Sequence, residues 1–320
     1  MNKTYYEKAI IQLKLHHNYV AFFLTLSCNL KCNYCINIHN GGDRVSQAHR
    51  NGLTAEEWIE AANRLVLRGD LPLTLQGGEP TLYKGFYKFV NDVKPDVKMD
   101  LLTNLMFDID KFIKEVPVWR FNRVAPYAPI RVSYHPGQND INDLIQNTLK
   151  LQDAGFKVGL FGILQPEGSL REHILQVKER CLNIGIDFRT KEFLGEYDGT
   201  LHGTFKYEGS VDGPELKTCE CRTTELIVDP AGYVYKCHAD LYKGRNPYAH
   251  ILDESLNEDA IDEFRSCSSY GDCNPCDVKI KTNRFQEYGH TSVEIRNVKE
   301  GISDNNSKVN KNVQVKNQNG

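Results

Sequence analysis

Long hydrophobic runs, a cleavable signal sequence and a strong charge of either sign are all missing from this sequence. The longest apolar stretch is about Tyr19 to Leu26, far short of the roughly 20 residues that a membrane-spanning helix needs. The opening residues, MNKTYYEKAIIQLK, lack the apolar core and small-residue cleavage site of a secreted protein. A formal net charge of -3 gives no reason to expect nucleic acid as a partner. The sequence therefore predicts a soluble, cytoplasmic protein without a membrane or nucleic-acid partner.

Cysteine, by contrast, is abundant, and the ten cysteines are clustered. Three lie between Cys28 and Cys35, and six lie between Cys219 and Cys276. Only Cys181 stands alone, on the apolar face of a predicted helix, where packing in the core explains it. In a reducing compartment, clustered cysteines indicate metal binding more often than disulfide bonds.

Short apolar runs alternate with amphipathic segments from residue 19 to residue 195. The predicted strands are Val20–Leu26, Leu71–Leu75, Met99–Leu102, Ile130–Ser133, Val158–Ile163 and Ile186–Phe188. The predicted helices are Thr54–Arg68, Phe86–Val93, Leu144–Ala154 and Leu170–Leu182. The first of these helices begins with a capping signal, because Glu57 follows Thr54 by three residues. About six alternations predict an α/β fold, a partial (β/α)6 barrel of the TIM type, although periodicity alone does not distinguish it from an open doubly wound sheet.

The pattern changes after residue 195, which we take as the end of the barrel domain. Residues 196–300 form a predicted extension that is rich in cysteine, glycine and tyrosine. Within it, Leu226–Val228 and Tyr233–Tyr235 flank the turn sequence DPAG and predict a β-hairpin. Asp259–Phe264 predicts a short helix at most. Residues 301–320 are polar and almost free of large apolar side chains, which predicts a disordered tail.

The first cysteine cluster follows directly on the first predicted strand and consists of Cys28, Cys32 and Cys35. Three thiolates this close, on a loop that leaves a strand, can bind one side of a metal or iron–sulfur centre. Three ligands on a four-iron cluster leave one iron free for catalysis. A structural zinc site normally has a fourth ligand, so the alternative is a zinc site completed by a distant residue such as His39.

This CxxxCxxC pattern, with an aromatic residue before its last cysteine, resembles the radical S-adenosylmethionine (SAM) enzymes. The sequence GGEP after the second strand resembles the GGE motif of that family, and the resemblance extends over about residues 19–195. It implies that the three cysteines hold a catalytic [4Fe–4S] cluster, and that the backbone and carboxylate of the GGE motif hold the SAM amino group. The further residues implied by the two motifs are Tyr34, Gly77, Gly78, Glu79 and Pro80.

Later strand ends match the family in the order in which it places SAM contacts. The fifth strand contains a stretch similar to the family's adenine-contacting GxIxG, in degraded form, because Gln165 occupies the second glycine position. On the sixth strand, Arg189 is a candidate for the SAM carboxylate or for the substrate. The resemblance thus implies cofactor contacts at Thr103, Asn104, Ser133, His135, Ile163 and Arg189.

The second cysteine cluster begins with an element similar to the CX9-15GX4C element of SPASM and twitch extensions in radical SAM enzymes. Either Cys219 or Cys221 begins this element, Gly232 lies within it, and Cys237 ends it. A hairpin holds two cysteines at its open ends close enough to share a metal. Which of the first two cysteines is the ligand stays open.

Cys273 and Cys276 further along form a CxxC knuckle. Two cysteines from the hairpin and two from the knuckle make four ligands, enough for one auxiliary [4Fe–4S] cluster. The full SPASM pattern is absent, so the shorter twitch form with one cluster is the better match. Cys267 is either spare or a hydrogen-atom donor, and a structural zinc ribbon is the alternative for the whole cluster.

The resemblance implies an enzyme that reductively cleaves SAM to a 5′-deoxyadenosyl radical and abstracts a hydrogen atom from its substrate. An external one-electron reductant such as flavodoxin or ferredoxin would be its partner. Few residues precede Cys28, which leaves no room there for a leader-binding domain. We therefore expect a small-molecule or sugar substrate that is oxidised or epimerised, with a ribosomally made peptide as the alternative. A non-catalytic zinc-binding protein is a more remote alternative.

Overall fold

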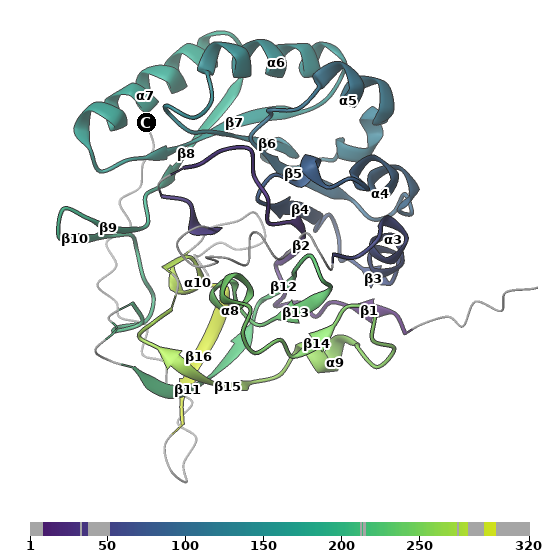
Figure 1. Ribbon diagram of the computed structural model, residues 1–320, viewed down its shortest axis with the longest axis vertical. Coiled ribbons are helices and arrows are strands. Elements are labelled where there is room, and N and C mark those ends of the chain that lie inside the picture. Colours follow the sequence, from purple (N-terminus) through teal and green to yellow (C-terminus); the bar gives the residue numbers. More distant parts are fainter. Residues whose placement is uncertain are drawn as a thin grey trace, which may run out of the picture.

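The computed structural model describes residues 9–32, 34–37, 52–211, 213, 216–273, 275–280 and 291–298, with the backbone alone for Pro275 and Cys276. In this part of the chain the main sheet has nine strands, in the order β14-β13-β12-β2-β4-β5-β6-β7-β8 (Figure 1). Six consecutive strands of it are β2 (Tyr19–Thr25), β4 (Leu73–Gly77), β5 (Met99–Thr103), β6 (Ile130–Tyr134), β7 (Val158–Leu164) and β8 (Asp187–Glu192). They are parallel throughout and correspond to the predicted strands, so the α/β class with a partial barrel is confirmed.

Helices connect the parallel strands and cover the outer face of the sheet, as the arc in Figure 1 shows. They are α3 (Ala55–Asn63), α4 (Phe86–Asp92), α5 (Ile109–Glu115), α6 (Ile141–Asp153) and α7 (Gly168–Asn183), with 3₁₀ turns η1 (Pro80–Leu82) and η2 (Val118–Phe121). The predicted capping box of α3 is confirmed, because the Thr54 side chain accepts from the Glu57 amide while the Glu57 carboxylate accepts from the Thr54 amide.

Strand β2 has an apolar core on each of its faces. Phe22 packs on the helix side against Trp58, with ring centroids 4.7 Å apart. Phe23 points to the opposite face, where it packs edge-on against Tyr242 of the extension. Since successive side chains of a strand alternate between its faces, this one buried strand joins the helix-covered core to the extension.

The predicted hairpin is confirmed as β12 (Glu225–Val228) and β13 (Tyr233–Tyr235), followed by β14 (Ala249–His250). Strand β12 also pairs in parallel with β2, so the hairpin continues the main sheet. The Asp229 carboxylate shapes its turn by accepting from the amides of Ala231 and Tyr233 and from the Tyr235 hydroxyl. A domain boundary after residue 195 stays a prediction.

Most of the other elements of the extension have no counterpart in the sequence analysis. A three-stranded antiparallel sheet is formed by β11 (Lys217–Thr223), β15 (Arg265–Tyr270) and β16 (Val293–Asn297). Helices α8 (His238–Lys243) and α10 (Pro275–Val278) lie between this sheet and the main one (Figure 1). The remaining elements are β9 (Gly195–Tyr197), β10 (Thr200–His202) and α9 (Glu258–Ile261), the last in place of the short helix expected from Asp259.

The first helix is shorter than predicted. It ends at Asn63, and β3 (Leu65–Val66) then pairs in parallel with β1 (Ile11–Gln12). Arg64 explains the change, because its buried guanidinium donates to the carbonyls of Ile251, Asp253 and Leu256 and so fixes the chain at the helix end. The predicted disordered tail lies outside the described residues. In the described part, no helix is both long and apolar enough to cross a membrane.

Candidate functional site

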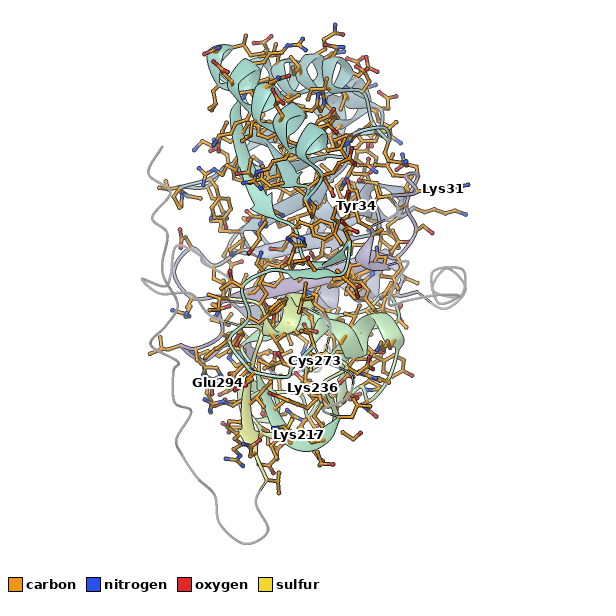
Figure 2. The ribbon with its side chains drawn as sticks, turned by 90° about the vertical axis from the view of Figure 1, so that its left-hand side faces the viewer. Lys31, Tyr34, Lys217, Lys236, Cys273 and Glu294 are labelled. Carbon is orange, nitrogen blue, oxygen red and sulfur yellow. The ribbon has the colours of Figure 1, made fainter. Side chains whose placement is uncertain are left out.

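The loop with the first three cysteines leaves the carboxyl end of β2, and the neighbouring strand ends hold it in place. The Lys31 amide donates to the Gln138 side chain at 2.9 Å, and the Asn29 side chain donates to the Met106 carbonyl at 3.0 Å. Figure 2 shows Lys31 and Tyr34 at the sheet-and-helix part of the molecule, away from Cys273 and Lys236 in the extension. The loop is thus fixed where functional loops of α/β barrels lie.

Two glycines let the predicted GGEP turn pack against the start of this loop. The Gly78 amide donates to the Thr25 carbonyl at 2.9 Å, and the Glu79 amide donates to the Ser27 carbonyl at 2.6 Å. Gly77 has φ +145°, and a Cβ atom on it would lie 1.9 Å from the Thr25 oxygen. A Cβ atom on Gly78 would lie 2.0 Å from the Ser27 oxygen. Only glycine permits this approach, so the motif connects the end of β4 to the residue before Cys28.

The carboxylate of Glu79 is fully buried and bonds to the chain itself. It accepts from the Thr81 amide and hydroxyl, from the Thr103 hydroxyl and, at 2.7 Å, from the Asn104 amide. Burial raises the pKa of Glu79, and these hydrogen bonds oppose the rise. Pro80 begins the 3₁₀ turn η1 directly after it. The carboxylate thus joins the end of β4 to the end of β5, and a direct contact with SAM stays a prediction.

Tyr34 and His135, both predicted cofactor residues, contact each other. The Tyr34 hydroxyl lies 2.9 Å from Nδ1 of His135, across the space between the cysteine loop and the end of β6. Burial, together with the charge of Lys191, lowers the pKa of His135 to about 4, so its imidazole is neutral at neutral pH. A neutral imidazole can accept the tyrosine proton at Nδ1.

The other predicted contacts follow the inner face of β6 to β8. Ser133 is the register neighbour of Phe161, which in turn neighbours Arg189. The Arg189 guanidinium bonds to the Asp187 carboxylate and the Pro126 carbonyl, near the amino ends of the strands, and its contact with SAM or substrate stays a prediction.

Lys191 is the cation that the sequence analysis missed on this face. It is the register neighbour of Ile163, and its ammonium lies 5.2 Å from the centre of the Phe161 ring. The period-2 alternation of β8 could have identified it, because it lies two residues beyond Arg189 and closer to the carboxyl edge.

Three buried cysteine sulfurs meet in the small sheet of the extension. Cys219 and Cys221 lie on one face of β11, two residues apart, and Cys267 on β15 is the register partner of Cys219. The three sulfur atoms all lie within 4.8 Å of one another. Hydrogen bonds from the other two thiols lower the pKa of Cys267. Cys267, left open in the sequence analysis, therefore belongs to the group, and both possible first cysteines of the hairpin element are in it.

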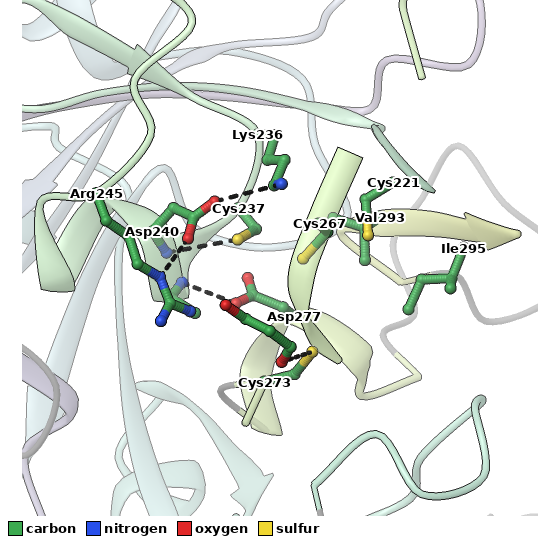
Figure 3. A pocket seen from close by; sticks show the side chains of 12 residues that line it. Cys221, Lys236, Cys237, Asp240, Arg245, Cys267, Cys273, Asp277, Val293 and Ile295 are labelled. Atoms are coloured by element: carbon green, nitrogen blue, oxygen red, sulfur yellow. Dashed lines mark hydrogen bonds and ion pairs between the residues drawn. The ribbon is translucent and has the colours of Figure 1, made fainter. Parts of the chain in front are cut away.

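Two further cysteines line a cavity against this group (Figure 3). Cys237 ends the hairpin and caps α8, where its sulfur accepts from the Asp240 amide, and Cys273 begins the knuckle. Lys236 lies on the wall with its ammonium 3.7 Å from the Asp240 carboxylate, which also accepts from Arg245 at 2.6 Å. The side chain of Cys276 lies outside the described residues.

Asp277 holds the knuckle against the hairpin. Its buried carboxylate accepts from the amides of His238 and Ala239, both at 2.8 Å, at the beginning of α8. Cys237 immediately precedes these amides. A single carboxylate thus brings the predicted knuckle beside the last cysteine of the hairpin.

The donor sets at both sites fit iron–sulfur clusters. At the first, the Cys28 sulfur accepts from the Leu30 amide at 3.4 Å and from the Asn104 side chain at 3.7 Å, and these bonds oppose the rise that burial causes in the pKa of Cys28. Among the residues that the structure describes, the sulfur atoms of its three cysteines do not all lie within 4.8 Å of one another, unlike the three in the extension. In a polynuclear cluster each thiolate can bind a different iron, so such close contact is not required. At the second, described thiols from β11, β15, the end of the hairpin and the knuckle surround one cavity.

No protein-family model matches the chain. It is 28% identical over 183 residues to the GTP 3′,8-cyclase of Nautilia profundicola, covering 55% of this chain and 56% of that protein. It is 35% identical over 304 residues to molybdenum cofactor biosynthesis protein 1 of Dictyostelium discoideum, covering 90% of this chain and 45% of that protein. The chain thus spans about half the length of the curated relatives it matches.

Two solved structures also match the chain in part. Native anSMEcpe with bound AdoMet superposes with a TM-score of 0.49 at 14% identity, covering 78% of this chain and 80% of that one. Streptococcus suis SuiB bound to precursor peptide SuiA superposes with a TM-score of 0.43 at 13% identity, covering 78% and 64%. From the cysteine loop, the GGEP turn packed against it and the similarity to the curated relatives, we conclude that the chain belongs to the radical SAM family, which uses a [4Fe–4S] cluster and SAM.

Proposed function

We propose that this protein is a radical SAM enzyme that abstracts a hydrogen atom from a small-molecule or sugar substrate, which it oxidises or epimerises. The observation that carries the proposal is the packing of the Cys28–Cys35 loop against the GGEP turn and the ends of β5 and β6. When bound, the reduced cluster and SAM together supply a 5′-deoxyadenosyl radical that takes a hydrogen atom from the substrate.

The chain's own part is to hold the reactants and to exclude water. Cys28, Cys32 and Cys35 would hold the cluster, and burial already raises the pKa of the free Cys32 thiol to about 11. A bound metal must therefore displace the proton from this thiol. The Tyr34–His135 pair closes the space between the loop and β6. Lys191, at the carboxyl edge of β8, is our candidate for the carboxylate of SAM or an anionic group of the substrate.

The curated relatives favour a small molecule, because the names of several refer to GTP as the compound that is cyclised. For this chain we propose only the class of substrate. An auxiliary [4Fe–4S] cluster in the extension would take up or relay an electron, and Cys219, Cys221, Cys237, Cys267, Cys273 and Cys276 are the candidate ligands. The enzyme would be cytoplasmic and would receive its electron from an external one-electron reductant such as flavodoxin or ferredoxin.

The test is the iron and acid-labile sulfide content of the chain after anaerobic reconstitution. We expect about eight irons in the wild type and about four when Cys28, Cys32 and Cys35 are all changed to alanine. Cys267→Ala should lower the iron bound by the extension. Cys181→Ala should leave the iron content unchanged, because Cys181 is fully buried in the apolar core, away from both cysteine clusters. If the wild type instead binds about four irons and the triple variant binds none, while zinc is retained, the extension is a structural zinc site.

Activity is measured separately with a chemical reductant. The reconstituted wild type should release 5′-deoxyadenosine from SAM, and the triple variant should not. Candidate amino sugars and other small molecules should accelerate this release. Acceleration by a ribosomally made peptide and by none of the small molecules would reverse the proposed substrate class.

A further inference from the structure

Asn104 connects the buried Glu79 carboxylate to a cysteine of the first cluster. Its side-chain nitrogen lies 2.7 Å from Oδ1 of Asn29 and 3.7 Å from the sulfur of Cys28. An amide nitrogen has two hydrogens, so it can donate to both. Its backbone amide donates to Glu79 at 2.7 Å. Asn104 itself is buried, whereas Cys28 and Asn29 lie on the exposed side of the loop.

The amide of Asn104 has one possible orientation. Its Oδ1 accepts from the Met106 amide at 2.9 Å, and therefore its nitrogen must face Cys28 and Asn29. Asn29 in turn donates to the Met106 carbonyl, which completes a ring of hydrogen bonds between the cysteine loop and the turn after β5.

The backbone of this turn is strained in a way that keeps Asn104 in place. Leu105 has φ +59°, a left-handed conformation that is unfavourable for a residue other than glycine. Two contacts hold it there. The Leu105 amide donates to the Thr103 hydroxyl at 3.0 Å, and that hydroxyl itself donates to Glu79. The Leu105 side chain is buried in the main core. Such strain persists only where the surroundings enforce it.

We propose that Asn104 is a positioning residue for the first iron–sulfur cluster: its amide donates to the Cys28 thiolate, and the Glu79 carboxylate fixes it through the Asn104 amide and Thr103. This inference rests on the proposed function, since it requires a cluster on Cys28. Hydrogen bonds to cluster sulfurs stabilise the reduced, more negative state and raise the reduction potential. The Glu79 carboxylate therefore affects the potential of the first cluster indirectly, by holding Asn104 in place.

The test is a redox titration of the anaerobically reconstituted full chain, followed by electron paramagnetic resonance. Added SAM identifies the signal of the first cluster, because only that cluster responds to it. Asn104→Leu keeps the approximate size of the side chain and removes the donor. We expect a lower potential, and a fraction of reduced cluster that falls several-fold at a fixed poise near the wild-type midpoint.

Gln138→Leu is the matched control, because it removes a bond to the same loop without touching a cysteine sulfur. It should keep the wild-type potential. Loss of the first cluster's iron from Asn104→Leu but not from Gln138→Leu would also support the positioning role. An unchanged potential in Asn104→Leu, with full iron content, would overturn it. Absence of this cluster from the wild type would instead overturn the proposed function.

Discussion

At the scale of single residues, the site depends on places where a side chain would not fit. Gly78 is the sharpest case, because a Cβ atom there would lie 2.0 Å from a backbone oxygen that has no room to move. Gly168→Ala offers a matched control at the beginning of α7, where the added carbon would meet no atom of the described chain within 4 Å beyond the local backbone.

We expect Gly78→Ala to destabilise the fold by about 1–3 kcal/mol, as overpacking does. It should also lower the iron content, since the turn is bonded to the residues just before Cys28. Gly168→Ala should be neutral or stabilising by up to about 1 kcal/mol. Urea unfolding under anaerobic conditions and iron analysis check both variants. Equal unfolding midpoints for the two would show that the close approach at Gly78 has no energetic consequence.

Local spacing predicts which residues gather at the cysteine loop, but not what each side chain contacts. Cys28, Cys32 and Cys35 are neighbours in sequence, so their loop could be predicted without a fold. The bonds of Glu79 to Thr103 and Asn104 depend on the packing of β4 beside β5. The rotation of Arg189 towards Asp187 likewise depends on the direction of a side chain, which spacing does not specify.

At the scale of elements, the long periodic segments of the barrel were predictable, whereas the short elements of the extension were not. Helix α8 has six residues, and its first two amides donate to Asp277, which is distant in sequence. Strands β11 and β15 present cysteine instead of an apolar face, so the hydrophobic period that identifies most strands is weak there. Tertiary contacts decide these elements.

Asp277→Ala should destabilise the protein by about 2–3 kcal/mol, because two buried amides of α8 lose a charged acceptor. Iron bound by the extension should fall as well, since the carboxylate places the knuckle beside Cys237. Asp272→Ala removes exposed ion pairs with Lys243 and Arg245 and should cost less than about 1 kcal/mol. Iron content and unfolding midpoints distinguish the two. If the extension keeps its full iron content in Asp277→Ala, the carboxylate does not position the knuckle beside Cys237.

At the scale of the whole molecule, the segment before β2 joins the barrel to the extension. Strand β1 pairs with β3, the Asn18 amide donates to the Thr224 carbonyl, and His16 lies 3.0 Å from the Asp262 carboxylate. The hairpin also extends the main sheet through β12. The two parts should therefore unfold together, and a buried titratable group at their junction should affect both.

His17 is that group. It is fully buried, and in the described part of the chain neither ring nitrogen has a hydrogen-bond partner. Burial first, and then the charges of His16 and Arg222, lower its pKa to about 4, while Asp262 opposes the shift. The unfolded chain, with an ordinary histidine pKa near 6.5, thus binds a proton more readily than the folded protein.

Stability should consequently fall as the pH decreases from about 6.5 to about 4, by roughly 3 kcal/mol through this residue, and His17 should contribute no further loss below that range. The His17→Leu variant should lose this component and keep the smaller pH dependence of the remaining groups. The measurement is the urea midpoint of both proteins at several pH values between 7 and 4.5, with loss of absorbance from the clusters followed in the same samples. Because cluster loss at acid pH affects both proteins alike, the difference between them isolates the histidine. Parallel pH curves would mean that the ring is hydrated or paired in solution, and that the junction between barrel and extension has no acid-sensitive core.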